Sequence, residues 1–232
     1  MLLELNIKGL CQKHGIKFDD FLADLDVDHV QELSLYDLEA ICEEYELDLQ
    51  ALLFKPLFQR SVLDAKIKDI RMLILDVDGV LTDGRLYYGN NGEELKAFDI
   101  QDGLGIKLLQ RGGVQVGIIT GRVSVLLQRR ADELGMEPVV QGREDKLTAL
   151  NELLQNMSVE LHEIAFIGDD LPDLAVINRV GLGITVANGN AAVAAKAKWQ
   201  TSRSGGNGAV REAAEMILAA QGKLDDILAA YQ

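Results

Sequence analysis

Carboxylates gather in two short segments of this chain, and each segment directly follows a run of apolar residues. Asp76 and Asp78 follow the run MLIL, while Asp169 and Asp170 follow IAFIG, with Asp173 close behind. Carboxylates this dense repel one another unless a cation or solvent compensates their charge. Paired acids beside a divalent cation can act as a nucleophile and as a general acid and base. The two segments are therefore candidates for one metal-assisted site.

A hydroxyl and a lysine lie between these acidic segments. Thr120 follows the apolar run VGII, and Lys146 begins a stretch with helical periodicity. Taken alone, residues 119–122 are typical of an ordinary strand end and turn. The acids after MLIL do not form a calcium loop, because Val80 and Leu81 stand where such a loop needs an oxygen ligand and a glycine. The combination of these polar residues, in this order, is what points to a catalytic site.

Short apolar runs alternate with helical periodicity over residues 61–232, and this pattern predicts the elements that position the polar residues. Strands are predicted at Met72–Leu75, Val114–Ile119, Val139–Val140, Ile164–Ile167 and Gly183–Val186. Helices are predicted at Gly103–Arg111, Ser124–Leu134, Lys146–Gln155, Leu171–Arg179 and Ala209–Gln221. The alternation indicates an α/β fold with a doubly wound parallel sheet. Such a sheet binds its ligand outside the carboxyl ends of the strands, where Asp76, Thr120 and Asp169 stand.

Residues 1–60 have a different composition and predict a separate, all-α domain. They hold 13 acidic and 5 basic side chains and only 2 of the 22 glycines, whereas residues 61–232 hold 24 acidic and 18 basic side chains. Apolar residues recur at spacings of three and four, as in short helices, and Ser34 stands where a helix N-cap is expected. We predict a domain at 1–60 and a second at 61–232, meeting near Pro56–Asp64.

Two segments of the acidic domain resemble helices of a lambda-repressor-like helix-turn-helix domain, namely Ile16–Val27 and Ser34–Leu53. The interval between Val27 and Ser34 leaves no room for a recognition helix. The segment Phe18–Phe54 carries 12 acidic residues and no lysine or arginine, whereas contact with DNA needs cations against phosphates. We therefore expect a degenerate domain that binds no nucleic acid and serves a protein interaction or acts as a spacer.

The overall composition excludes several classes of protein. The apolar runs are shorter than the roughly 20 residues of a membrane-spanning helix, and Glu4 stands where a signal peptide carries positive charge. The formal net charge of -14 disfavours a nucleic-acid or anionic-membrane surface. Cys11 and Cys42 have no metal-ligand spacing and are expected to be reduced core thiols. We expect a cytoplasmic protein.

The motifs together resemble the haloacid dehalogenase superfamily of phosphohydrolases, whose pattern is Asp-x-Asp, then Thr or Ser, then Lys, then paired acids. That pattern is filled by Asp76, Asp78, Thr120, Lys146 and Asp169. From about Lys66 onward, longer segments such as LILDVDGVLTDGRLYYGNNGEELKAF, QGREDKL, IGDDLPD and GGNGAVRE are similar to the 3-deoxy-D-manno-octulosonate 8-phosphate phosphatase family.

The resemblance implies a Mg²⁺-dependent phosphatase of lipopolysaccharide biosynthesis. In it, Asp76 is the nucleophile that forms an aspartyl-phosphate, and Asp78 protonates the leaving alkoxide and then deprotonates water. The metal ligands are the carboxylates of Asp76 and Asp169 and the backbone carbonyl of Asp78. Thr120 and Lys146 hold the phosphoryl oxygens.

The resemblance also implies how the substrate is enclosed. The intervals between Asp76 and Thr120 and between Thr120 and Lys146 are 43 and 25 residues long, too short for a separate cap domain. A hairpin is predicted from Arg85–Tyr88 and Glu94–Phe98, around the turn residues GNNG. In the homotetramer implied by the family, this hairpin and the Gly205–Gly208 tail of a neighbour close the site.

Substrate identity depends on a further set of residues. The candidate substrate-binding residues are Thr120, Gly121, Arg122, Lys146, Gln101, Asn207 and Arg211. The family pattern has arginine at position 101 and a basic residue at position 207, so two cations are missing here. A nonulosonate 9-phosphate is therefore an alternative substrate. A different alternative is a regulatory or scaffold protein that uses the N-terminal helical domain, although all five chemical positions are retained.

Overall fold

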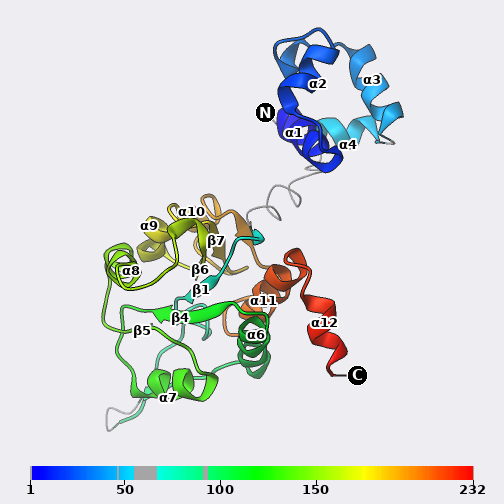
Figure 1. Ribbon diagram of the computed structural model, residues 1–232. Helices are drawn as coiled ribbons and strands as arrows, with labels where there is room; N and C mark the ends of the chain where they lie inside the picture. The colour runs from blue at the N-terminus through cyan, green and yellow to red at the C-terminus, as the bar shows by residue number, and fades with distance from the viewer. Residues whose placement is uncertain (1, 46, 55–66, 91–93, 232) are drawn as a thin grey trace. The chain divides into compact units, whose positions relative to one another are not determined.

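The computed structural model describes residues 2–45, 47–54, 67–90 and 94–231. The chain divides into two compact units, Met1–Ala65 and Lys66–Gln232, which are described separately (Figure 1). The predicted domain boundary between residues 60 and 61 lies outside the described residues. Within the described ranges, every helix is too short or too polar to cross a membrane.

The first unit is helical. Its helices are α1 (Leu2–His14), α2 (Phe18–Asp24), α3 (Leu35–Glu44) and α4 (Leu49–Phe54), with a 3-10 turn at Val30–Glu32. Apolar side chains from all four helices form one core, in which Cys11 and Cys42 are buried as free cysteines. Ser34 is the predicted N-cap of α3, because its hydroxyl accepts a hydrogen bond from the backbone N–H of Asp37 at 3.3 Å. The likeness to a helix-turn-helix domain stays a prediction.

The second unit is built on a six-stranded parallel sheet in the order β5-β4-β1-β6-β7-β8. The strands are β1 (Met72–Leu75), β4 (Gln115–Ile119), β5 (Val139–Val140), β6 (Ile164–Gly168), β7 (Leu182–Thr185) and β8 (Trp199–Gln200). Every residue of β1 and β6 is buried, as expected for central parallel strands covered on both faces. The predicted α/β doubly wound fold is confirmed.

Helices cover both faces of the sheet. They are α6 (Ile100–Arg111), α7 (Val125–Leu134), α8 (Lys146–Leu154), α9 (Leu174–Ile177), α10 (Ala191–Ala194), α11 (Ala209–Ala220) and α12 (Leu224–Ala229). Side chains of α8 and α9, such as Leu150 and Val176, share a core with Ile74 and Phe166 of the sheet. Figure 1 shows α6 and α11 side by side, away from α8 and α9.

Several element boundaries differ from the sequence prediction. Helix α6 begins at Ile100 rather than Gly103, because the Asp99 carboxylate caps it by accepting from the backbone N–H of Gln101. The predicted helix over residues 171–179 is a 3-10 turn at Leu171–Asp173 followed by the short α9. The short elements β8, α10 and α12 carry too few residues to give a periodic signal.

The predicted hairpin is present, with shorter strands than expected. Strands β2 (Tyr87–Tyr88) and β3 (Glu94–Leu95) pair antiparallel, Tyr87 opposite Leu95. Residues 91–93 of the turn lie outside the described residues. Tyr88 and Leu95 are each 65% exposed, so the hairpin presents apolar surface to its surroundings.

A buried acid joins α6 to the start of α11. Asp102 is 1% exposed, and its carboxylate accepts hydrogen bonds from the backbone N–H groups of Gly208 (3.3 Å) and Arg211 (2.8 Å). These N–H groups have no partner within their own helix, since they belong to its first turn. Asp102 therefore caps α11 from another helix.

We expect Asp102 to make stability pH-dependent. Burial raises its pKa to about 6 from the usual 3.8, although the N–H of Arg211 opposes the shift. Because the folded chain then binds this proton more tightly than the unfolded chain, the contribution to stability falls as pH rises from about 4 to about 6. Chemical unfolding of wild type and Asp102→Asn between pH 4 and 7.5 should show their difference in unfolding free energy changing across that window. A difference in unfolding free energy that stays constant over this pH range would show that Asp102 is not the group responsible.

Candidate active site

Three neighbouring strands deliver polar residues to one edge of the sheet. Asp76 follows β1, Thr120 follows β4 and Asp169 follows β6, and β1 lies between the other two strands. The backbone N–H of Asp76 donates to the carbonyl of Ile167 at 3.0 Å, and that of Thr120 donates to Val140 at 2.9 Å. The parallel ladders thus extend one residue past the strands and fix the backbone that carries these side chains.

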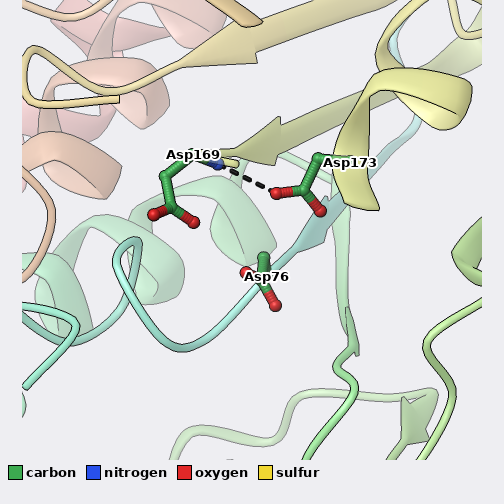
Figure 2. A group of neighbouring side chains, drawn as sticks. All are labelled: Asp76, Asp169 and Asp173. Carbon is green, nitrogen blue, oxygen red and sulfur yellow. Dashed lines mark hydrogen bonds between the residues drawn. The ribbon is translucent and has the colours of Figure 1, made fainter. Parts of the chain in front are cut away.

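Lys146, the first residue of α8, lies among the acids at this edge. Its Nζ is 2.8 Å from Oδ1 of Asp76 and 2.6 Å from Oδ1 of Asp173. The other carboxylate oxygen of Asp173 accepts hydrogen bonds from the backbone N–H groups of Asp169 (3.0 Å) and Asp170 (3.2 Å). Figure 2 shows Asp76, Asp169 and Asp173 as neighbours at this edge of the sheet. One carboxylate oxygen from each residue lies within 4.8 Å of one from each of the other two. We refer to these three residues as the acidic cluster.

Burial and repulsion between neighbouring carboxylates raise the pKa values of Asp76 and Asp169. Asp76 is 7% exposed, and burial raises its pKa to about 6 although Lys146 opposes the shift. Burial and the charges of Asp76 and Asp173 raise the pKa of Asp169 to about 7. Burial disfavours the charged form of Lys146, but Asp76 and Asp173 outweigh that effect and its pKa is raised. One lysine therefore does not fully compensate the negative charge of the cluster.

The buried oxygen of Asp169 fits a cation. Within the described part of the chain, Asp169 Oδ1 has no hydrogen-bond partner although it is fully enclosed. Gly79 brings its backbone against this carboxylate at a φ of +97°, and a Cβ there would lie 2.1 Å from Asp169 Oδ2. Only glycine leaves room for such an approach. A buried, unpartnered carboxylate oxygen beside two further carboxylates matches the donor set that Mg²⁺ prefers.

Asp78 contacts a different set of partners from Asp76. Its carboxylate accepts a hydrogen bond from Nζ of Lys96, and Nε of Arg122 lies 3.6 Å from its other oxygen. Lys96 was not among the predicted site residues, because no periodicity or spacing in the sequence shows that the residue after the hairpin contacts Asp78. Its position in the matched segment EELKAF was the only signal.

Asp173, which is named above only as an acid close behind Asp169 and Asp170, both pairs with Lys146 and caps a turn. Asp173 is 1% exposed and pairs with Lys146 directly. Its carboxylate also accepts hydrogen bonds from two backbone N–H groups and so caps the 3-10 turn. Asp173 is therefore both an ion-pair partner of Lys146 and a capping residue. Asp170 instead accepts a hydrogen bond from the side chain of Asn190 at 3.1 Å.

The candidate substrate-binding residues fall in different surroundings. Arg122 lies beside Asp78, whereas the guanidinium of Arg211 donates to Glu215 on its own helix at 2.6 Å. Gln101 accepts a hydrogen bond from Nη1 of Arg203 at 3.0 Å. Arg203, which the sequence analysis did not consider, thus brings a cation to the position where the family pattern has arginine. Asn207 is exposed.

The Gly205–Gly208 segment packs against the loop that follows β1 in the same chain. The N–H of Gly206 donates to the carbonyl of Val80 at 2.8 Å. A Cβ on Gly205 would lie 1.7 Å from the carbonyl oxygen of Gly79, so only glycine fits there. The segment therefore supports the loop that follows β1 in its own chain, a contact that was not predicted from the sequence.

Comparison with known proteins places this site in a family. The model of the haloacid dehalogenase-like hydrolase family matches residues 139–212. The 3-deoxy-D-manno-octulosonate 8-phosphate phosphatase of Escherichia coli (strain K12) is 46% identical over 162 residues, which cover 70% of this chain and 86% of that protein.

Solved structures agree with that match. A phosphatase of the same name from Moraxella catarrhalis, in complex with magnesium, phosphate and 3-deoxy-D-manno-octulosonate, superposes with a TM-score of 0.73 at 46% identity and covers 74% of this chain and 99% of that one. The cobalt-bound Haemophilus influenzae enzyme gives a TM-score of 0.67 at 42% identity, covering 68% and 93%. The chain is thus a haloacid dehalogenase-like hydrolase and belongs to the 3-deoxy-D-manno-octulosonate 8-phosphate phosphatase family.

Proposed function

We propose that this protein hydrolyses 3-deoxy-D-manno-octulosonate 8-phosphate to the free sugar acid and phosphate, as a step of lipopolysaccharide biosynthesis in the cytoplasm. The observation that carries the proposal is the acidic cluster with Lys146 at the carboxyl ends of β1 and β6. Proteins similar to this one over most of their length are named for this activity.

Magnesium is the proposed cofactor, because the residues present fit it. The cluster offers only hard oxygen donors, and Asp169 Oδ1 is buried without a partner in the described residues. We assign the carboxylates of Asp76 and Asp169 and the backbone carbonyl of Asp78 as its ligands. When bound, the ion offsets the negative charge that the acids and a phosphate dianion bring together.

Hydrolysis then proceeds in two steps on the protein's own groups. The Asp76 carboxylate attacks phosphorus, the bond between phosphorus and the sugar oxygen breaks, and Asp78 donates a proton to the departing alkoxide. In the second step Asp78 takes a proton from a water molecule, which attacks the aspartyl-phosphate and releases phosphate and free Asp76. The hydroxyl of Thr120 and the ammonium of Lys146 hold the phosphoryl oxygens.

Recognition of the sugar acid is assigned to the candidate substrate-binding residues. Arg122, beside Asp78, is the favoured partner of the sugar carboxylate, and Gly121 is the neighbouring candidate contact. Arg211 is the weaker candidate, because its guanidinium donates to Glu215 on its own helix, whereas the guanidinium of Arg122 lies beside the proposed proton carrier Asp78. Gln101 and Asn207 remain candidate contacts, and the Arg203 guanidinium that donates to Gln101 supplies positive charge there.

One substrate panel tests the proposed function. Phosphate release should be measured with Mg²⁺ from octulosonate 8-phosphate, nonulosonate 9-phosphates and simple hexose phosphates. We expect the highest kcat/KM for octulosonate 8-phosphate and loss of turnover in excess chelator. A higher kcat/KM for a nonulosonate 9-phosphate would favour the alternative substrate, and no release from any ester would favour the scaffold alternative.

A homotetramer is proposed from the family resemblance, and the exposed apolar side chains of the hairpin and of two helix starts support a subunit contact. Tyr88 of β2 and Leu95 of β3 are each 65% exposed, and Ile100 and Val125, at the starts of α6 and α7, are 84% and 85% exposed. Exposed apolar side chains gathered on neighbouring elements are typical of subunit contacts. Light scattering of the full chain in solution measures the assembly directly.

The N-terminal unit is proposed to bind a protein partner and to be dispensable for chemistry. It has its own core, and every proposed catalytic residue lies in the other unit. A chain that begins at Ser61 should therefore fold and keep kcat and KM within about twofold of the full chain. Loss of all activity would mean that residues 1–60 complete the site or the assembly.

The N-terminal unit is also expected not to bind nucleic acid, because Phe18–Phe54 has no lysine or arginine to contact phosphates. Tight binding of duplex DNA by the full chain at physiological salt would contradict this expectation.

A further inference from the structure

The residue that follows the hairpin is a buried lysine in contact with Asp78. The Lys96 side chain is 3% exposed, and that of Asp78 is 21% exposed. The Nζ atom of Lys96 donates a hydrogen bond to Oδ1 of Asp78. An ammonium withdrawn from water to this degree requires a counter-charge and hydrogen-bond acceptors. Asp78 supplies that counter-charge, so the two side chains hold each other in place.

The second oxygen of Asp78 is linked to the same hairpin through Arg122. The Nε atom of Arg122 lies 3.6 Å from Oδ2 of Asp78, and Nη2 of Arg122 donates to the hydroxyl of Tyr88 at 3.1 Å. Tyr88 belongs to β2, while Lys96 directly follows β3. Both strands of the hairpin therefore reach the carboxylate of Asp78, one through Lys96 and the other through Arg122.

We propose that Lys96 is a positioning residue that holds the Asp78 carboxylate in place for proton transfer. This inference rests on the proposed function, in which Asp78 is the proton carrier. Asp78 stands two residues from Asp76 and is ionised after it has given its proton to the leaving alkoxide, so a bound divalent cation then attracts its carboxylate too. Lys96 gives that carboxylate a different partner and fixes its orientation. Displacing a reacting group by about 1 Å can cost about 10²-fold in rate.

The two halves of the reaction depend differently on this proton carrier. A sugar alkoxide leaves only when a proton reaches it, whereas p-nitrophenolate is stable as an anion and leaves without one. The second step, attack of water on the aspartyl-phosphate, needs Asp78 as base whichever substrate was used. Removing Lys96 should therefore slow both steps with a sugar phosphate but only the second step with p-nitrophenyl phosphate.

Rapid-quench kinetics of Lys96→Met in the full chain with Mg²⁺ test this inference. With octulosonate 8-phosphate, kcat should fall about 10²-fold while KM stays near the wild-type value, as for loss of a general acid. With p-nitrophenyl phosphate, a burst of about one p-nitrophenolate per site should appear at a near wild-type rate, followed by slow turnover. Lys96→Arg, which keeps the cation, should recover part of kcat. Lys223→Met, whose ammonium bonds the carbonyl of Gly112, should match wild type throughout.

Two results would overturn the inference. One is a kcat of Lys96→Met on the sugar phosphate within about threefold of wild type, because a positioned general acid contributes much more. The other is loss of the p-nitrophenolate burst in both Lys96→Met and Lys96→Arg, which would make Lys96 a structural support of Asp76. Absence of phosphate release by the wild-type protein would instead refute the proposed function. That result comes from the wild-type assay alone, so it is distinguished from a failure of the inference about Lys96.

Discussion

Replacing Asp76 with Asn should abolish the covalent step and lower phosphate release by far more than 10²-fold. The amide keeps the shape of the side chain but has no charge with which to attack phosphorus, and it is a poorer ligand for a divalent cation. Loss of a nucleophile removes an entire pathway rather than one favourable contact. Phosphate release at saturating Mg²⁺ measures the rate. Mass spectrometry of acid-quenched enzyme shows whether phosphate is attached to the peptide that contains Asp76.

Asp78→Asn provides the comparison for that variant. It should also lose at least about 10²-fold in rate on the sugar phosphate, the usual size of a general acid or base contribution, but it should still carry phosphate on Asp76 after reaction with p-nitrophenyl phosphate. Asp132→Asn, an exposed acid of α7 that accepts a hydrogen bond from Gln128, should behave as wild type. Near wild-type turnover by either site variant would show that the roles are assigned wrongly.

Replacing Lys146 with Met should destabilise the metal-free protein and remove most activity. Lys146 is 4% exposed and is the cation between Asp76 and Asp173. Removing one partner of a buried ion pair leaves the other charges uncompensated and costs about 3–5 kcal/mol. Loss of a contact to the phosphoryl oxygens should lower kcat by about 10²-fold or more. Thermal unfolding in excess chelator and phosphate release with Mg²⁺ measure the two effects.

The same variant should respond more strongly to magnesium than wild type does. Without the lysine, the acidic cluster holds more uncompensated negative charge, so Mg²⁺ should raise its unfolding temperature by more than it raises that of wild type. Lys223→Met, which removes a lysine remote from the cluster, should show the wild-type response. Equal unfolding temperatures of Lys146→Met and wild type in chelator would show that the ion pairs of Lys146 with Asp76 and Asp173 do not stabilise the metal-free protein.

The fold and the edge that carries the site could be predicted because the evidence is local. β1 and β6 are continuous apolar runs, each followed at once by carboxylates, and parallel strands bring their ends together. Lys96 and Arg203 could not be placed in this way. Their contacts with Asp78 and Gln101 join residues 18 and 102 positions apart, and depend on how the hairpin and the last loop fold back. No periodicity encodes such a contact.

The packing of Gly205 and Gly206 against the loop after β1 determines how much of the chain must be synthesised before the enzyme can be active. Asp76 emerges from the ribosome well before Gly205 and Gly206, but its strand lies inside the sheet and the loop that follows it is supported by these later residues. Pairings of this sequence separation form late in folding. We therefore expect nascent chains that end before Gly205 to be inactive even though all the acids are present, with activity first appearing in released chains that extend through α11.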